Sequence, residues 1–254
     1  MELPMRPIII GAGRGRRLNS MTDHEPKCYV RIGGRRILDG MLEALEASGL
    51  GQPVFIGGYL IDVIRADYPH VTFCHNDQWE HNNILDSLLC ANEYMDGGFV
   101  CTYADILYRA SVVRRALDHP GDIVLCVDVA WRDRYADRSE HPEADAEKII
   151  ASGDRLEAIS RGINPGAATG EYIGVAKFTP RGVEQLREQY GEAKARYGGR
   201  IWKEETPFEK AYLIHLLETM VDAGVPIHVV TTAGDYMEVD TEEDYALANE
   251  RWEA

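Results

Sequence analysis

The chain has 254 residues, of which 45% are hydrophobic and 27% charged, and its formal net charge at pH 7 is −15. This composition is ordinary for a globular protein, and the length is sufficient for one well-buried core. The acidic balance argues against nucleic acid and anionic membranes as partners. No apolar run reaches the roughly 18 residues that cross a bilayer. The amino terminus lacks the pattern of a signal peptide, so the sequence predicts a cytoplasmic protein.

Apolar runs of strand length alternate with helical patterns through the first half of the chain, which is typical of a sheet flanked by helices. The expected strands cover residues 7–10, 54–56, 71–74, 98–103 and 122–127. Apolar residues at helical spacing predict helices over residues 37–48, 60–66, 84–94 and 111–117.

The second half begins with residues 131–147, whose dense charge and weak apolar period predict a surface excursion. Further strands are expected at residues 148–150, 156–159, 172–178, 227–230 and 236–239, and helices at 180–190, 208–223 and 242–252. No repeat, low-complexity tract or linker divides the chain. We therefore predict one domain over residues 1–254, with an α/β fold: a Rossmann-like mixed, mainly parallel sheet flanked by helices.

A glycine-rich loop follows the first expected strand, since residues 10–18 read Ile-Gly-Ala-Gly-Arg-Gly-Arg-Arg-Leu. Glycine permits left-handed backbone and lets backbone N–H groups approach a ligand, so such a loop can hold phosphates. The expected contacts are Gly11, Ala12, Gly13 and Gly15. The loop lacks the lysine and hydroxyl residue of a P-loop and the third glycine of the dinucleotide fingerprint. The downstream motifs of a protein kinase are missing as well.

The spelling of this loop, followed by Pro26 and Lys27, resembles the signature of the nucleotidyltransferase superfamily that activates sugars and alcohols as nucleoside diphosphate derivatives. Its usual form is Leu-Ala-Ala-Gly-x-Gly-x-Arg-Leu and then Pro-Lys, and here Gly11 replaces the first alanine. The resemblance implies the nucleotide-diphospho-sugar transferase type of fold. It also implies that Arg17 holds the β- and γ-phosphates and that Lys27 holds the α-phosphate. Arginine offers phosphate a planar fork of donors, and lysine offers a compact charge.

The same resemblance implies a Mg²⁺ cofactor held by two aspartates. Asp105 follows the apolar run at residues 99–103, and Asp240 follows the run at 236–239. Open sheets bind ligands beyond the carboxyl ends of their strands, and Mg²⁺ prefers carboxylate, water and phosphate oxygens. A simpler interpretation stays open for each residue: an exposed acid at a strand end for Asp105, and a helix cap for Asp240.

A segment in the first half of the chain indicates which nucleotide is bound. Residues 82–88 read Asn-Asn-Ile-Leu-Asp-Ser-Leu and resemble the Asn-Asn-x-x-x-Ser-Leu segment of the phosphocholine and phosphonate cytidylyltransferases. This resemblance implies that Asn83 and Ser87 contact CTP. The alternative is that both residues belong to a helix start, where asparagine and serine are common.

The acceptor contacts are also taken from this resemblance: Arg161, Glu171 and Trp202. Sugar-phosphate members of the superfamily carry Glu-Lys-Pro where this chain has residues 157–162, and here only Arg161 supplies a cation. Trp202 could face a quaternary amine by cation–π attraction. Packing in the core is the alternative for this tryptophan.

Together these residues imply a Mg²⁺-dependent cytidylyltransferase that transfers CMP from CTP to a small phosphorylated or phosphonate acceptor and releases pyrophosphate. Such an acceptor needs no strong base, because its second ionisation lies near pH 6. The candidates are phosphocholine, aminoethyl- or hydroxyethylphosphonate, phosphonopyruvate and a phosphorylated amino acid.

Two other functions stay open. One is a sugar-1-phosphate nucleotidyltransferase that uses UTP, dTTP or GTP. The other is a non-catalytic nucleotide-binding protein on the same fold. A homo-oligomer stays open for all three.

Overall fold

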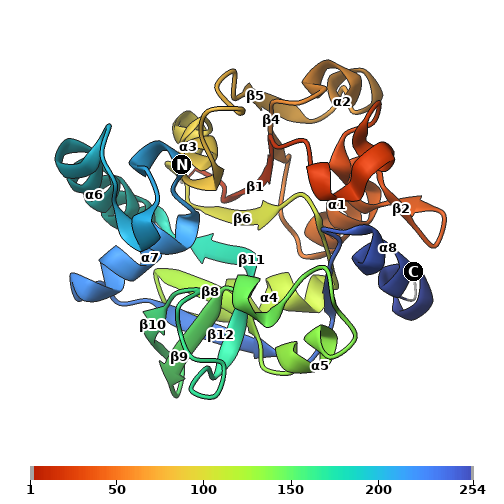
Figure 1. The fold of residues 1–254 in the computed structure, drawn as a ribbon. Coiled ribbons are helices and arrows are strands. Elements are labelled where there is room, and N and C mark those ends of the chain that lie inside the picture. The colour runs from red at the N-terminus through yellow and green to blue at the C-terminus, as the bar shows by residue number, and fades with distance from the viewer. Residues whose placement is uncertain (1–2, 253–254) are drawn as a thin grey trace.

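A nine-stranded sheet runs through the centre of the computed structural model, which describes residues 3–252 (Figure 1). The strands lie in the order β5 (Thr72–His75), β4 (Val54–Gly57), β1 (Arg6–Gly11), β6 (Phe99–Tyr103), β11 (Gly170–Phe178), β8 (Ile123–Asp128), β12 (His228–Thr232), β10 (Arg155–Ile159) and β9 (Lys148–Ser152). Among these strands, only β10 and β11 run against the direction of the others. The sheet is therefore mixed and mainly parallel, which confirms the predicted fold class.

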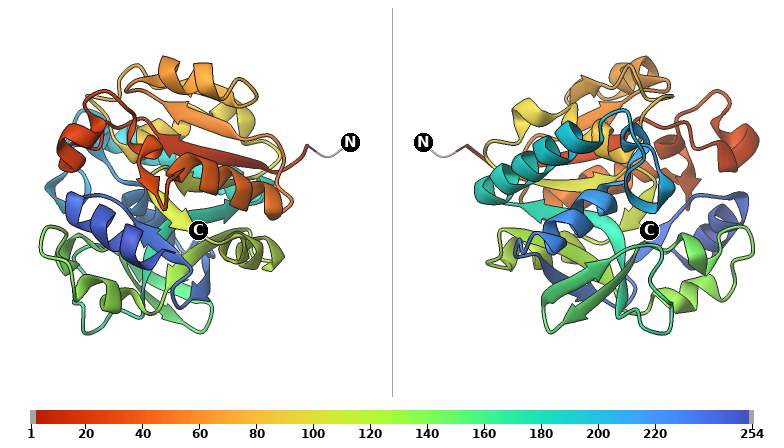
Figure 2. Two further views of the ribbon diagram at one scale, coloured as in Figure 1. Left: turned by 90° about the vertical axis from the view of Figure 1, so that its right-hand side faces the viewer. Right: turned by 60° about the vertical axis from the view of Figure 1, so that its left-hand side comes forward.

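Helices cover both faces of this sheet (Figures 1 and 2). One face carries α1 (Ile37–Ala47), α2 (Ile61–Asp67), α4 (Ala110–Asp118) and α8 (Glu242–Arg251), and the other carries α3 (Ile84–Leu89), α6 (Pro180–Tyr197) and α7 (Leu213–Asp222). Side chains alternate along a strand, so Ile9 of β1 packs in the first core while Ile8 and Ile10 pack in the second. None of the described helices is long and apolar enough to cross a membrane.

Two expected helices differ from the prediction because each is interrupted. The helix expected at 84–94 ends at Leu89, and a separate 3-10 turn, Asn92–Tyr94, follows it. The helix expected at 208–223 begins only at Leu213, because Pro207 opens a short 3-10 turn over Phe208–Lys210. Apolar spacing alone does not distinguish these tighter turns from one continuous helix.

The strand expected at 236–239 forms outside the main sheet. β13 (Tyr236–Glu238) pairs antiparallel with β7 (Ile106–Tyr108), a strand that the sequence analysis did not predict. The pairing continues past the strand end, where Val239 N donates to Asp105 O at 3.0 Å. This ribbon brings the end of β13 to the end of β6. A second small ribbon, β2 (Arg31–Ile32) with β3 (Arg35–Arg36), precedes α1.

The charged excursion at residues 131–147 is more ordered and more buried than predicted. It contains the helix α5 (Trp131–Tyr135) and a 3-10 turn over Glu143–Asp145. Trp131 and His141 are buried although they lie among many charged residues. The predicted surface excursion is therefore partly buried, because ion pairs to α8 and to β11 hold this segment against the body.

Gly11 ends β1 where two other strands leave no room for a side chain. A Cβ at this position would lie 2.5 Å from Phe55 Cζ and 2.8 Å from Ala104 Cβ, both closer than such contacts allow. We expect Gly11→Ala to lower the free energy of unfolding by about 1–3 kcal/mol, measured by urea denaturation. Gly13→Ala is the matched control, because a Cβ there meets no described atom within 4 Å. Equal stability of the two variants would contradict the proposed clash.

Candidate active site

The loop after β1 forms one wall of a cavity of about 190 Å³ at the carboxyl end of the strands, called here the loop cavity. Gly11, Ala12, Gly13 and Gly15 all line it, so the structure brings the predicted backbone contacts together. Gly15 has a φ of 70°, in the left-handed region. A Cβ there would also lie 2.6 Å from Lys27 Cδ. Both facts require glycine, and the second shows that the loop packs against the stem of this lysine.

Lys27 joins the two aspartates that the sequence analysis predicts as metal ligands. Its Nζ donates to Asp105 Oδ2 at 2.7 Å and also to Asp240 Oδ1. Burial by itself lowers the pKa of Lys27, but the two carboxylates outweigh burial and raise this pKa above its usual value. Burial likewise opposes the effect of Lys27 and Arg17 on Asp240, whose pKa they hold well below its usual range. Lys27 and Asp240 are therefore both charged at neutral pH.

Arg17 reaches the same group from a short 3-10 helix, Arg16–Thr22. Its guanidinium pairs with Asp240, and its Nη1 lies 3.6 Å from Asp145 Oδ2. About half of the Arg17 side chain is exposed (51%), so this cation stands at the rim rather than in the buried centre. A phosphate at the rim can therefore replace its present partners with little rearrangement.

The opposite wall of the loop cavity is polar. Asn76 is buried and donates from Nδ2 to Asn82 Oδ1 and to Ser87 Oγ, both at 2.8 Å. Asn83 caps α3, because its Oδ1 accepts from Ile84 N at 2.9 Å. Asn83 and Ser87 thus line the loop cavity and also serve the local structure, as the alternative interpretation supposed.

Trp79 and Asn82 also line the loop cavity, although the sequence analysis assigned no role to either. A Cβ on Gly58 would lie 2.5 Å from Trp79 Cγ, so this glycine makes room for the indole ring. Both residues follow β5 at the carboxyl end of the sheet. Their place just after a parallel strand was the signal that could have identified them.

A second cavity, of about 450 Å³, begins where the loop cavity ends and is called here the acidic cavity. Ile84, Tyr103 and Asp105 line both cavities, so the two meet at the Lys27 site. Carboxylates outnumber guanidinium groups among the lining residues, which include Asp105, Asp145, Glu147, Glu171, Glu238 and Asp240 against Arg17 and Arg161. Negative charge is therefore in excess within this cavity.

Glu171 lies in the acidic cavity, but both of its oxygens already have partners. Its Oε2 accepts from Arg134 Nη2 and its Oε1 accepts from Tyr135 Oη, each at 2.6 Å. Arg134 also pairs with the fully buried Asp128 at the end of β8. These contacts attach α5 to the sheet, so Glu171 acts first as an anchor for the excursion.

Arg161 and Glu147 line the acidic cavity but not the loop cavity. The guanidinium carbon of Arg161 lies 3.9 Å from the ring centre of Tyr212. Its Nη2 donates to Glu147 Oε1 at a long 3.4 Å, and Glu147 Oε2 accepts from Tyr103 Oη at 3.4 Å. Burial raises the pKa of Glu147 to about 7, more than Arg161 lowers it. Glu147 was not predicted from the sequence, because it stands in the charged excursion without any motif around it.

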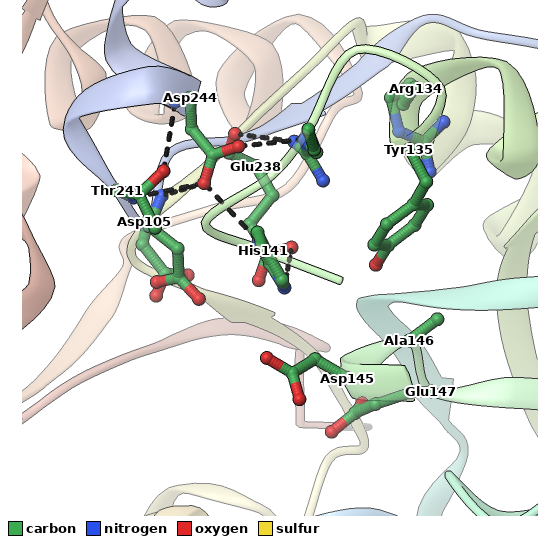
Figure 3. A network of polar contacts seen from close by, with 12 residues as sticks. Asp105, Arg134, Tyr135, His141, Asp145, Ala146, Glu147, Glu238, Thr241 and Asp244 are labelled. Carbon is green, nitrogen blue, oxygen red and sulfur yellow. Dashed lines mark hydrogen bonds and ion pairs between the residues drawn. The ribbon is translucent and has the colours of Figure 1, made fainter. Parts of the chain in front are cut away.

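His141 of the excursion and Asp244 and Thr241 at the start of α8 form one polar network (Figure 3). This network fixes the backbone at Asp240. The buried carboxylate of Asp244 accepts from Asp240 N at 3.1 Å and from Thr241 N at 3.0 Å. Arg138 Nε lies 2.8 Å from Asp244 Oδ1, and His141 Nδ1 lies 3.3 Å from Oδ2. Thr241 caps α8, because its side chain accepts from Asp244 N. Asp240 is therefore not the helix cap, although the first turn of α8 holds its backbone.

The donor atoms around Asp105 and Asp240 suit a divalent cation. Ligand atoms of His141, Glu238 and Asp240 all lie within 4.8 Å of one another. Asp105 Oδ1 is buried and has no hydrogen-bond partner among the described residues. Mg²⁺ takes carboxylate oxygens of this kind together with water and phosphate oxygens. The residues present therefore fit the predicted metal.

Trp202 lies away from both cavities and does not line either one. Its ring centre is 5.2 Å from that of Phe208 and 5.9 Å from that of Tyr197, on the side of α6 and α7. The interpretation as an acceptor contact is therefore corrected to packing. The ring of Trp202 packs against Tyr197 and Phe208 and does not face a cavity.

Comparison with known families agrees with this geometry. A family model described as the MobA-like NTP transferase domain matches residues 7–197. The chain belongs to this family. The match includes the loop, Lys27, Asp105 and Arg161, and it confirms the predicted resemblance to nucleotidyltransferases.

Two curated relatives of this MobA-like transferase act on phosphorylated compounds. CTP:phosphoglutamine cytidylyltransferase of Campylobacter jejuni is 26% identical over 257 residues, covering 97% of this chain and 100% of the relative. Choline-phosphate cytidylyltransferase of Streptococcus pneumoniae is 29% identical over 108 residues, covering 41% of this chain and 47% of the relative.

One solved structure confirms the fold. The CTP:phosphocholine cytidylyltransferase of Streptococcus pneumoniae superposes with a TM-score of 0.75 at 19% identity, covering 99% of this chain and 100% of that one. At this identity the likeness establishes the nucleotide-diphospho-sugar transferase type of fold alone.

The raised pKa of Glu147 predicts how stability depends on pH. Its ordinary value is 4.5 and its folded value is about 7, so the folded chain holds a proton that the unfolded chain has lost between these two values. Stability therefore falls as pH rises through this window. Relative to Glu147→Gln, we expect the wild-type free energy of unfolding to fall by about 3 kcal/mol from below to above the window.

Urea denaturation of both proteins at a series of pH values measures this difference. All other titrating groups are common to the two proteins, so they cancel to first order. A stability difference that does not change with pH would contradict the assigned burial of Glu147.

Proposed function

We propose that this MobA-like transferase moves CMP from CTP to a small acceptor that carries a phosphate or phosphonate group, with release of pyrophosphate. The observation that carries the proposal is the position of Lys27. Its Nζ lies between Asp105 and Asp240 where the loop cavity and the acidic cavity meet. A nucleotide in one cavity and an acceptor in the other would bring their phosphates together at this amine.

The residues of the loop cavity account for the nucleotide half of the reaction. Backbone N–H groups of the loop can receive the triphosphate, and Arg17 at the rim can pair with its outer phosphates. The charge of Lys27 stabilises the α-phosphate as negative charge builds on it. The bond between the α-phosphorus and its bridging oxygen breaks, and the electron pair leaves with pyrophosphate.

The acceptor oxygen requires no general base. A phosphate monoester or a free phosphonate group is already largely anionic near pH 7, so its oxygen can attack the α-phosphorus directly. The new bond then joins that oxygen to CMP. The absence of a base agrees with the surroundings of Lys27. Among the described residues its amine contacts Asp105 and Asp240, both as ion pairs, and no histidine.

Asp105 and Asp240 are the residues that would hold Mg²⁺. The ion would neutralise and orient phosphate oxygens during the transfer. Asp240 is presented by Asp244 and the α8 terminus, and the free Oδ1 of Asp105 supplies a further donor.

The choice of CTP and of a phosphorylated acceptor is supported by the full-length relative from Campylobacter jejuni. A sugar-phosphate acceptor is disfavoured by residues 157–162, which lack the Glu-Lys-Pro of the sugar-specific members. A panel of CTP, UTP, dTTP and GTP against phosphorylated, phosphonate and sugar-1-phosphate acceptors tests this choice. We expect pyrophosphate release only with CTP and a non-sugar acceptor. Turnover of UTP or dTTP with a sugar-1-phosphate would replace the proposal, and CTP binding without any turnover would show a non-catalytic protein.

Loss of the Lys27 charge should damage the chemistry far more than the fold. We expect Lys27→Ala to lower kcat/KM for CTP by about 100- to 1000-fold, because one transition-state donor of this kind contributes about 3–4 kcal/mol. Pyrophosphate release measures the rate, and circular dichroism checks folding. Lys194→Ala, on the exposed face of α6, is the matched control and should keep wild-type activity. Near-normal activity of Lys27→Ala would remove the assigned role.

Asp105 should control the response to Mg²⁺. We expect Asp105→Asn to raise the Mg²⁺ concentration needed for half-maximal rate and to weaken Mn²⁺ binding measured by isothermal titration calorimetry, because a ligand charge is lost. Asp133→Asn, an exposed position on α5, is the control. An unchanged metal response in Asp105→Asn would show that the metal binds elsewhere.

A further inference from the structure

The acidic cavity holds a carboxyl group and a guanidinium group side by side, those of Glu147 and Arg161, and neither residue lines the loop cavity. Their ion pair is loose, since the nearest nitrogen and oxygen are 3.4 Å apart. Arg161 Nε is buried and has no hydrogen-bond partner among residues 3–252. Each side chain can therefore form stronger bonds with a ligand than with its present partner.

The other carboxylates of the acidic cavity are less available. Glu171 is fully engaged by Arg134 and Tyr135, as described above. Asp105 and Asp240 face Lys27, where the phosphates would meet. Asp145 pairs with Arg17, and Glu238 lies beside His141. Glu147 is thus the carboxyl group of the acidic cavity that can receive a cationic group of the acceptor.

Two of the four tyrosine rings that line this cavity already face a guanidinium group. The guanidinium carbon of Arg161 lies 3.9 Å from the ring centre of Tyr212, and that of Arg134 lies 4.7 Å from the ring centre of Tyr236. Guanidinium groups therefore already occupy two aromatic faces that a trimethylammonium group would use. A ligand with a positive charge alone would also face Arg161 itself.

We propose that the acceptor is a phosphorylated α-amino acid, whose carboxylate pairs with Arg161 and whose ammonium pairs with Glu147. This inference rests on the proposed function, because it places the phosphate of the same molecule at the Lys27 end. The ammonium and carboxylate of the amino acid satisfy both side chains at once and together add no net charge beside them. A simple amine or a simple acid would leave one buried charge without its new partner, which is costly.

The test uses matched acceptors of increasing length. Each set contains a phosphorylated L-amino acid (phosphoserine, phosphohomoserine or amide-phosphorylated glutamine), its decarboxylated amine and its deaminated acid. Pyrophosphate release with CTP gives kcat/KM for every member. In at least one set we expect the amino acid to exceed both analogues by about 10- to 100-fold, since hydrogen bonds to charged groups contribute about 1.5–3 kcal/mol each.

Two variants assign the contacts. Arg161→Gln should abolish the preference for the amino acid over the amine, and Glu147→Gln should abolish the preference over the deaminated acid. The KM for CTP should stay near the wild-type value in both, whereas a general structural defect would alter all acceptors and CTP together. Arg196→Gln, exposed on α6, is the control and should keep both preferences. The wild-type panel decides the question even where a variant does not fold.

The possible results distinguish failure of the amino-acid acceptor from failure of the proposed cytidylyltransferase activity. Equal or better turnover of the amines, the acids or phosphocholine would overturn the amino-acid acceptor and leave the cytidylyltransferase in place. Failure of every acceptor with CTP, including the phosphonates of the broader panel, would instead refute the proposed function, and the amino-acid inference with it.

Discussion

The contact of Lys27 with Asp105 and Asp240 is the constraint around which the site is built. A buried ammonium without a partner would be costly, and so would two buried carboxylates facing each other. Three segments of the chain therefore have to meet: the 3-10 turn Lys27–Tyr29, the end of β6 and the end of β13. The glycine at position 15 belongs to the same constraint, since any side chain there would displace the lysine.

The position of Asp240 depends on a second layer of buried charge. Asp244 holds the backbone of Asp240 and draws Arg138 and His141 from the excursion onto α8. The excursion in turn supplies Asp145 and Glu147 to the acidic cavity. One segment thus both fixes Asp240 through Asp244 and lines the acidic cavity, so the two parts of the site depend on the same stretch of chain.

The sequence was most informative where a motif is formed by residues that are close together in the chain. The loop spelling and Pro26-Lys27 indicated the nucleotidyltransferase family, and the alternation of apolar runs indicated the sheet and its helices. The meeting of Asp105 with Asp240 could not be derived from spacing, because it depends on the β7–β13 ribbon. Glu147 was missed because a long-range ion pair, rather than a local pattern, defines its role. Trp202 was misjudged because packing and binding place similar demands on an aromatic residue.

Phosphorus NMR of the complete reaction tests the central claim most directly, because it shows which phosphorus atom is attacked. With CTP, Mg²⁺ and a phosphorylated acceptor, the account predicts that free pyrophosphate appears together with a new diphosphate or phosphonate–phosphate linkage containing the α-phosphorus of CTP. The appearance of CDP with an acceptor that has gained the γ-phosphate would contradict it, because the attack would then lie away from Lys27 and its two aspartates.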